Sequence, residues 1–285
     1  MCTRLAILIL MFKEQMVYQA SGNGLNLTFT PEELLSNKIV PNTTSSGGRN
    51  WLELITGCFQ GLPSECPVQL WDFSHGGSDI DAALLPPHRN TTVQMVDQVR
   101  LWRDYAADLL PRPEGKTLTT WWTGINDCTH ISNNISITDN DAYLDADIEA
   151  YFRAVGTTAR HGLRTHLFLT APPVYRSPFA VKVRTGAEGY KKMLDSFNQK
   201  LTARMVKYAR DNPSQLILSF DASSVFLDIL DHPNHFGFND TTTFCIECED
   251  QEHRFWHTEE HPTEHVHRIL AKAVEKYLRN PDFVY

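Results

Sequence analysis

Short apolar runs alternate with helix-like patterns along almost the whole chain, and this alternation limits the fold more than any other feature. Apolar runs typical of buried strands occur at residues 4–12, 68–73, 118–122, 165–170 and 215–220. Between and after them, apolar residues at helical spacing predict helices. One helix starts at 51, and the others span 92–110, 139–161, 189–210, 223–230 and 263–279. Alternation of this kind predicts a parallel sheet with helices on both faces. We therefore expect an α/β fold, built as a three-layer α/β/α sandwich.

Composition and charge exclude two classes of partner. The chain has 285 residues, of which 42% are hydrophobic and 21% charged, as in globular proteins. No stretch approaches the roughly 20 apolar residues that span a bilayer, so we expect no membrane span. The net charge is −8, and the densest basic stretch is Lys191-Lys192. Nucleic-acid binding needs clustered Lys and Arg, so no nucleic-acid partner is expected.

The first 17 residues allow two interpretations. Arg4 followed by the apolar residues 5–12 resembles a short signal peptide. However, Lys13 and Glu14 follow at once, and residues 18–20 make a poor cleavage site. The alternative is a buried first strand. With no repeat or linker farther along, we divide the chain into an atypical N-terminal segment, 1–17, and a single domain, 18–285.

Glycosylation triplets and cysteines favour a secreted glycoprotein. Five Asn-x-Ser/Thr triplets occur, at Asn26, Asn42, Asn90, Asn134 and Asn239. Six cysteines are an even count that is compatible with disulfides. Cys58 and Cys66 bracket a turn, and Cys245 and Cys248 form a tight pair for which a local disulfide or free thiols are favoured over a zinc or redox site. The pairing among these four and Cys128 stays open.

Polar loops that follow the predicted strands suggest a binding edge. Ligands of parallel sheets bind outside the carboxyl ends of the strands. Gly124 ends one strand, and Asn126 just after it could donate a hydrogen bond to a developing oxyanion. The backbone N–H of Gly77 after another strand could be a second donor. The ordinary alternatives are an Asx turn at residues 124–127 and a tight turn at Gly77.

His261 is the candidate general base. It precedes Pro262 and Thr263, and Thr263 could cap the last helix. An imidazole has an ordinary pKa of about 6.5, which suits proton transfer near neutral pH. A zinc site is the competing interpretation, because the surroundings are rich in possible ligands: His257, His265, His267, Glu259, Glu260 and Glu264. The His-Glu-x-x-His order of metalloproteases is absent, so neither a metal nor another cofactor is predicted.

Taken together, several segments resemble the SGNH (GDSL-type) hydrolases, and more narrowly the fungal carbohydrate esterase family sixteen of acetylesterases. The matching segments are 44–51, 71–79, 122–127, 172–178, 220–221, 237–238, 243–245 and 255–263. The resemblance implies a flavodoxin-like parallel sheet and ester hydrolysis through an acyl-enzyme. It assigns His261 as base, with Asn126 and the Gly77 N–H as oxyanion donors. The implied substrate is a small ester or an acetylated carbohydrate.

Two departures from the family pattern affect the chemistry. The Gly-Asp-Ser that should carry the nucleophile falls on residues 15–17, so Val17 holds the serine position. A valine has no lone pair to attack a carbonyl. Ser21 lies about one helical turn away, which is too far for catalytic geometry. The family's orienting aspartate, three residues before the base, is Thr258 here, and Glu259 or Glu260 would have to replace it.

Two explanations account for the missing serine. Either the chain is an inactive paralogue that keeps the fold and sugar binding, or an incorrect first exon has replaced the true start. The tryptophans Trp71, Trp121, Trp122 and Trp256 could stack on sugar rings, although core packing is the more ordinary role for most of them.

Overall fold

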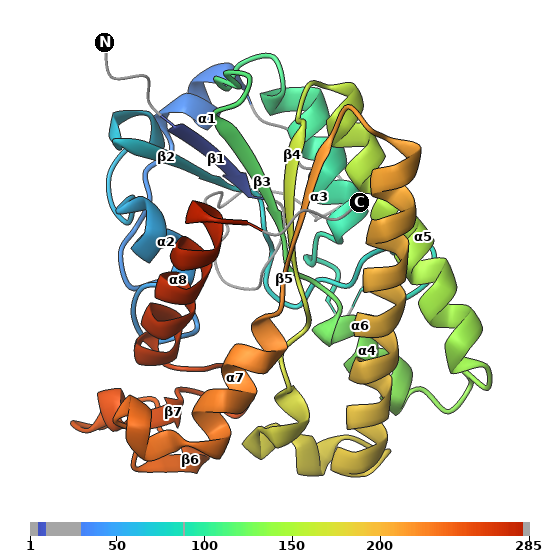
Figure 1. Ribbon diagram of the computed structural model, residues 1–285, viewed down its shortest axis with the longest axis vertical. Helices are drawn as coiled ribbons and strands as arrows, with labels where there is room; N and C mark the ends of the chain where they lie inside the picture. The colour runs from blue at the N-terminus through green and yellow to red at the C-terminus, as the bar shows by residue number, and fades with distance from the viewer. Residues whose placement is uncertain (1–4, 10–29, 88, 282–285) are drawn as a thin grey trace.

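Five parallel strands form the central sheet, in the order β2-β1-β3-β4-β5 (Figure 1). The computed structural model describes residues 5–9, 30–87 and 89–281. The strands are β1 (Leu5–Ile9), β2 (Val68–Asp72), β3 (Thr117–Trp121), β4 (Thr165–Leu169) and β5 (Leu216–Phe220). Each neighbouring pair is parallel. This is the flavodoxin-like order, and the predicted fold class is therefore confirmed.

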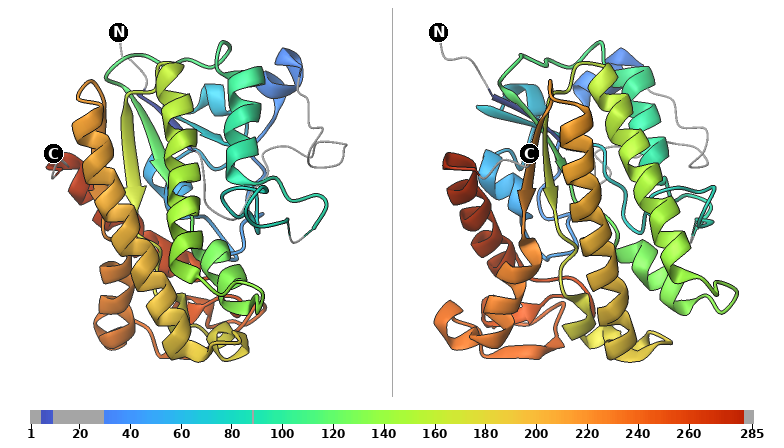
Figure 2. Two further views of the ribbon diagram at one scale, coloured as in Figure 1. Left: turned by 90° about the vertical axis from the view of Figure 1, so that its right-hand side faces the viewer. Right: turned by 45° about the vertical axis from the view of Figure 1, so that its right-hand side comes forward.

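Helices cover both faces of the sheet and give the molecule its three layers (Figure 2). One layer contains α3 (Met95–Leu101), α4 (Ile125–Asn133), α5 (Asn140–Arg160) and α6 (Gly186–Asp211). The other contains α2 (Trp51–Thr56), α7 (Ala222–Asp231) and α8 (Glu264–Arg279). Leu167 and Phe168 of β4 belong to the two different hydrophobic clusters. Successive side chains of a strand point to opposite faces, which is why an uninterrupted apolar strand serves both layers.

Smaller elements complete the described part of the chain. A short helix, α1 (Pro31–Ser36), precedes the sheet, and a two-stranded sheet of β6 (Asp240–Phe244) and β7 (Arg254–Trp256) lies between α7 and α8 in sequence. Single helical turns occur at Pro63–Glu65, Trp102–Ala106, Val174–Arg176, Pro178–Lys182 (η5), Pro233–Phe236 and Gln251–His253. Figure 1 shows the small sheet beyond the carboxyl ends of β3, β4 and β5.

Local sequence signals explain several of the boundaries. Asn50 caps α2, because its side chain accepts hydrogen bonds from the N–H groups of Leu52 and Glu53. Thr263 occupies the N-cap position of α8 but does not cap it with its side chain. Its hydroxyl donates instead to the carbonyl of Arg254, at 2.8 Å, so this residue ties α8 to β7.

Two helix predictions need correction. The single helix expected over 92–110 is shorter: α3 begins at Met95 and passes into a π-helical turn at Trp102–Ala106. The turn expected at residues 124–127 is the start of α4, because Gly124 is the N-cap of that helix. The side chain of Asn126 therefore projects from the first turn of a helix.

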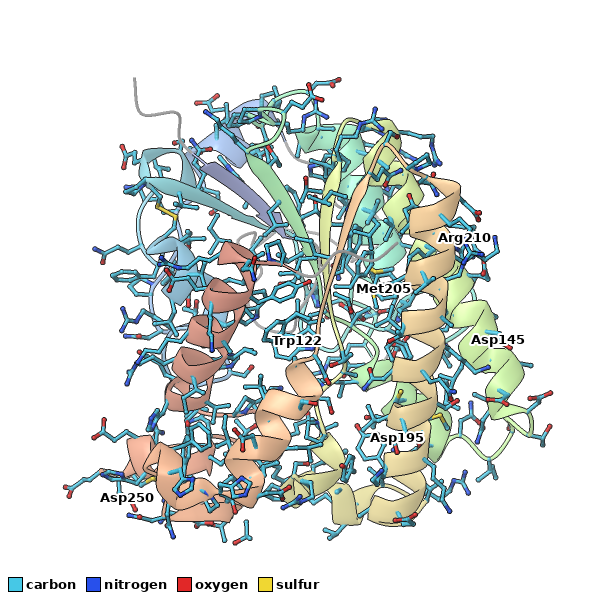
Figure 3. All side chains as sticks on the ribbon, in the orientation of Figure 1. Trp122, Asp145, Asp195, Met205, Arg210 and Asp250 are labelled. Carbon is cyan, nitrogen blue, oxygen red and sulfur yellow. A yellow bond between two sulfur atoms is a disulfide. The ribbon has the colours of Figure 1, made fainter. Side chains whose placement is uncertain are left out.

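The tryptophans near the predicted rim are core residues. The exposed fractions of Trp71, Trp121, Trp122 and Trp256 are 3%, 0%, 1% and 0%. Figure 3 shows Trp122 inside the fold, near the carboxyl ends of the strands. Sugar stacking on these four rings is thus excluded in this conformation, and they act by filling space between the layers.

Both cysteine pairs suggested by the sequence form disulfides, Cys58–Cys66 and Cys245–Cys248. Cys128 is a buried thiol in α4. Disulfides persist in oxidising compartments, which is consistent with an extracellular protein. In the described ranges, no helix combines the length and apolar character needed to cross a bilayer. The division into segments 1–17 and 18–285 stays a prediction, and β1 within the first segment pairs with β2 and β3.

Candidate active site

The candidate site lies where the strand order reverses. From β1 the chain moves to β2 on one side and then to β3, β4 and β5 on the other. Open parallel sheets bind ligands at this switch point, outside the carboxyl ends of the strands. Ile9, the last residue of β1, pairs with Asp72 and Thr120 at the ends of its two neighbours. The loops that carry Gly77 and Asn126 leave the sheet beside this point.

Asn126 meets the loop that contains Gly77. Its side-chain Nδ2 donates a hydrogen bond to the carbonyl of Ser78, at 2.9 Å. An amide nitrogen has two hydrogens, so one remains for a ligand while the other fixes the side chain. The structure thus places Asn126 against the loop that contains Gly77, and their role as oxyanion donors stays a prediction.

The turn before Asn126 requires a glycine. Gly124 has a φ of +112°, and a Cβ at this position would collide with the ring of Phe197 on α6. Both the dihedral and the close approach exclude other residues without strain. The sharp turn is what directs the start of α4, and hence Asn126, toward the β2 loop.

A second tether joins the same two loops beneath Asn126. The Asp127 carboxylate accepts a hydrogen bond from the N–H of Ile80, at 2.7 Å. The N–H of Asp79 donates to the Gln94 side chain, at 2.8 Å, and this amide also donates to the Asp79 carboxylate, at 3.2 Å. These polar groups are almost fully buried, and hydrogen bonds in such a low-dielectric environment are electrostatically stronger than in water.

The carboxyl groups of this network have unusual proton affinities. Burial raises the pKa of Asp127 to about 7, and the nearby charge of Asp79 adds to the shift. Burial likewise raises the pKa of Asp79 to about 7. Burial and the Asp127 charge also raise the pKa of Asp147 on α5. Burial and neighbouring like charges both disfavour the ionised form of these carboxyl groups.

His261 lies in a compact turn between β7 and α8. Its carbonyl accepts hydrogen bonds from the N–H groups of His257 and Thr258, at 2.8 and 3.3 Å. Trp256 and Pro262 form an isolated antiparallel bridge that closes the turn. The exposed fraction of His261 is 9%. The ring Nδ1 lies 2.5 Å from the Thr258 hydroxyl oxygen.

Glu259 does not orient the imidazole. Both of its carboxylate oxygens lie 2.6 Å from Nζ of Lys182 on η5, and its backbone carbonyl accepts from Phe179 N. This ion pair corrects the expectation that Glu259 could replace the missing aspartate. Thr258 makes the contact to Nδ1.

Contacts on both sides fix the His261 turn to neighbouring segments. On one side, Glu259 is held by η5, where Phe179 N donates to its carbonyl and Lys182 pairs with its carboxylate. On the other side, Glu264 accepts hydrogen bonds from the N–H and the guanidinium of Arg49, each at 2.9 Å. The two ends of the turn are therefore anchored to η5 and to the segment before α2.

The remaining predicted residues have separate outcomes. Val17 and Ser21 lie outside the described residues. Within the described ranges, no group of three or more His, Cys, Asp or Glu side chains is arranged to hold a metal ion, so the zinc interpretation gains no support. Sequence reasoning missed Asp147, although it shares the apolar face of its helix with Leu144 and Tyr151, a pattern that signals a buried acid.

Comparisons with known proteins agree with the motif resemblance. The chain is 27% identical over 263 residues to an acetylesterase from Thermothelomyces thermophilus, covering 89% of this chain and 83% of that protein. This similarity confirms the resemblance to acetylesterases. The sequence matches no protein-family model.

Solved structures also align along the chain, at low similarity. A mutant acetyl-xylooligosaccharide esterase from Geobacillus stearmophilus aligns with a TM-score of 0.45 at 13% identity, over 95% of this chain and 93% of that one. A second solved chain aligns with a TM-score of 0.48 at 11% identity, over 97% of this chain and 98% of that one.

Proposed function

We propose that this protein is a carboxylic ester hydrolase of the acetylesterase type, with acetylated carbohydrates as its substrate class. The observation that carries the proposal is the similarity to an acetylesterase along 89% of the chain. The hydrogen bond between Asn126 and Ser78 adds support, because it joins the two loops that carry the candidate oxyanion donors. A secreted location is part of the proposal, and the exposed Asn42, Asn90 and Asn239 are compatible with glycosylation.

The proposed reaction proceeds through an acyl-enzyme. A serine Oγ at position 17 would attack the acetyl carbon while His261 takes its proton. The Asn126 amide and the Gly77 N–H would hold the oxyanion, a contribution worth about 10²–10³ in kcat for a single donor. The protonated imidazole would then give its proton to the leaving sugar oxygen, and water would release acetate by the reverse sequence.

The chain as written lacks the group that starts this reaction. Val17 cannot form an acyl-enzyme, and Thr258 replaces the acid that orients the base. These two substitutions favour a second candidate function, an inactive paralogue that binds carbohydrate or has a structural role on the same fold. The alternative source of Val17, an incorrect first exon, predicts a transcript in which a Gly-Asp-Ser sequence joins Tyr18.

Hydrolysis of p-nitrophenyl acetate and of a peracetylated sugar tests the proposal. The protein as written should give no turnover above background. A variant with Gln15→Gly, Met16→Asp and Val17→Ser should gain turnover, and adding His261→Ala or Asn126→Ala should remove it. Folding of each variant is checked by circular dichroism. A folded triple variant that also carries Thr258→Asp and still shows no turnover would overturn the proposed function, whereas turnover by the original chain that depends on His261 would exclude the inactive paralogue.

A further inference from the structure

The environment of the His261 ring depends on one hydroxyl group. Thr258 Oγ1 lies 2.5 Å from His261 Nδ1. The same oxygen accepts hydrogen bonds from the backbone N–H of His261, at 3.1 Å, and from that of Glu260, at 3.4 Å. Thr258 is half-buried and His261 is buried. One oxygen therefore has three close partners, all from the turn that carries the proposed base.

The number of hydrogens and lone pairs decides the direction of the Thr258–Nδ1 contact. A hydroxyl has one hydrogen to donate and two lone pairs that accept. The two backbone N–H groups can only donate, so they use both lone pairs of Thr258 Oγ1. The remaining O–H must point at Nδ1. For Nδ1 to accept this hydrogen it must carry a lone pair, and a neutral imidazole then has its own hydrogen on Nε2.

We propose that Thr258 is a positioning residue that holds His261 as the Nε2–H tautomer. This is the opposite of the tautomer that a general base needs, since base catalysis requires a lone pair on Nε2 and a hydrogen on Nδ1 held by a carboxylate. In this tautomer His261 presents a hydrogen-bond donor to the site. The chain therefore differs from an active esterase at a second point, independent of Val17.

The reverse arrangement is disfavoured by the same count. If Nδ1–H donated to Thr258, the oxygen would receive three hydrogens on two lone pairs. An aspartate at position 258 would remove this conflict, because a carboxylate has about four acceptor sites and no hydrogen to donate. Thr258→Asp should thus reverse the tautomer. The neighbouring carboxylate of Glu259 cannot take this role while it is paired with Lys182.

Long-range proton–nitrogen correlation spectra of the ¹⁵N-His-labelled full chain test the tautomer directly. The His261 signals are assigned by their loss in His261→Gln. We expect a pyridine-type shift on Nδ1 and a pyrrole-type shift on Nε2 in the original chain and in Thr258→Ser. Thr258→Asp should exchange the two types, and Thr258→Val should give averaged shifts. Thr263→Val is the matched control, because it removes a hydroxyl from the same loop that bonds Arg254 rather than the ring.

A pyrrole-type shift on Nδ1 in the original chain would overturn the tautomer proposal, as would an unchanged pattern in a folded Thr258→Asp variant. The catalytic meaning of the tautomer rests on the proposed function, and a second measurement separates the two. In the triple variant with serine at position 17, Thr258→Asp should raise kcat by at least roughly tenfold, since a triad histidine in the wrong tautomer loses about 10⁴ in kcat. Exchange of the shifts without any turnover would refute the esterase function and leave the tautomer assignment intact.

Discussion

The two halves of the candidate site are held in place by different means. The oxyanion half, residues 77–80 and 124–127, is fixed by buried hydrogen bonds that join its two loops directly, Asn126 to Ser78 and Asp127 to Ile80. The base half, residues 257–263, is fixed by hydrogen bonds within its own turn and by a half-exposed ion pair between Glu259 and Lys182. The first half is therefore joined to the core across two loops, whereas the second is held mainly by contacts of its own turn and of the surface.

This difference explains which parts of a catalytic site a chain can lose. Removing a partner from a buried network leaves unsatisfied polar groups, which costs about 1–3 kcal/mol each. The oxyanion half would therefore be retained for stability even in a chain without catalysis. An orienting aspartate in the base half serves mainly the chemistry, and a threonine hydroxyl satisfies the same turn. Departure from the family at Thr258 and retention at Asn126 and Asp127 fit this distinction.

The largest expected effect is a loss of stability at the glycine that begins α4. In Gly124→Ala, the positive φ costs about 1–2 kcal/mol, and the collision with the buried Phe197 ring adds about 1–3 kcal/mol of overpacking. Urea unfolding should therefore show a loss of about 2–5 kcal/mol.

Gly57→Ala is the matched control for the Gly124 variant. Gly57 has a φ of +67° and open space where a Cβ would lie, so its substitution should cost only the backbone term, about 1–2 kcal/mol. Equal losses for the two variants would mean that the Phe197 ring moves aside. The turn before Asn126 would then not be rigid, and the oxyanion half would not be held more firmly than the base half.

A smaller effect is expected from the buried carboxyl groups of the oxyanion half. The pKa of Asp127 is raised to about 7 and that of Asp147 is raised as well, whereas unfolded aspartate titrates near about 3.9. The folded state thus binds more protons than the unfolded state above about pH 4, and up to about pH 7 for Asp127. Stability should fall as the pH rises through this window.

Urea unfolding at pH 5 and pH 8 measures this dependence. Asp147→Asn removes one titrating group and its charge near Asp127, so the difference in stability between the two pH values should shrink, by about 1.4 kcal/mol for each unit of pKa shift that is lost. Asp145→Asn, on the same helix (Figure 3), is the control, because its side chain is 65% exposed and pairs with Lys200. An unchanged difference in Asp147→Asn would show that burial does not raise the pKa of Asp147.

The sequence was sufficient for the fold and for locating the loops of the oxyanion half. Strands such as 68–73 and 165–170 were recognisable because both of their faces are buried, which produces continuous apolar runs. Gly124 and Asn126 could be located because a glycine at a strand end followed by a polar residue is a local signal. The start of α4 at this turn was not recognisable, since the Asx-turn and helix alternatives share the same residues.

The base half depended on contacts that local patterns do not contain. Lys182 and Glu259 are 77 residues apart, and no local sequence pattern predicts that they form an ion pair. The position of the Glu259 carboxylate therefore could not be predicted. The direction of the Thr258 contact follows from the lone pairs of one oxygen, which requires coordinates. The nucleophile position, Val17, lies outside the described residues, so its assignment still depends on the resemblance alone.

The smallest effect should come from the ion pair that anchors the base half. Lys182→Met keeps most of the aliphatic stem and removes the charge that holds Glu259. The two side chains are 55% and 34% exposed, and exposed pairs of this kind contribute about 0.2–1 kcal/mol. Urea unfolding should therefore show a loss below about 1 kcal/mol, close to that of the control Lys191→Met, which removes a pair with Asp195 on α6. A loss above about 2 kcal/mol for Lys182→Met alone would mean that the base half is held as firmly as the oxyanion half. The difference between the two halves would then no longer account for the departure at Thr258.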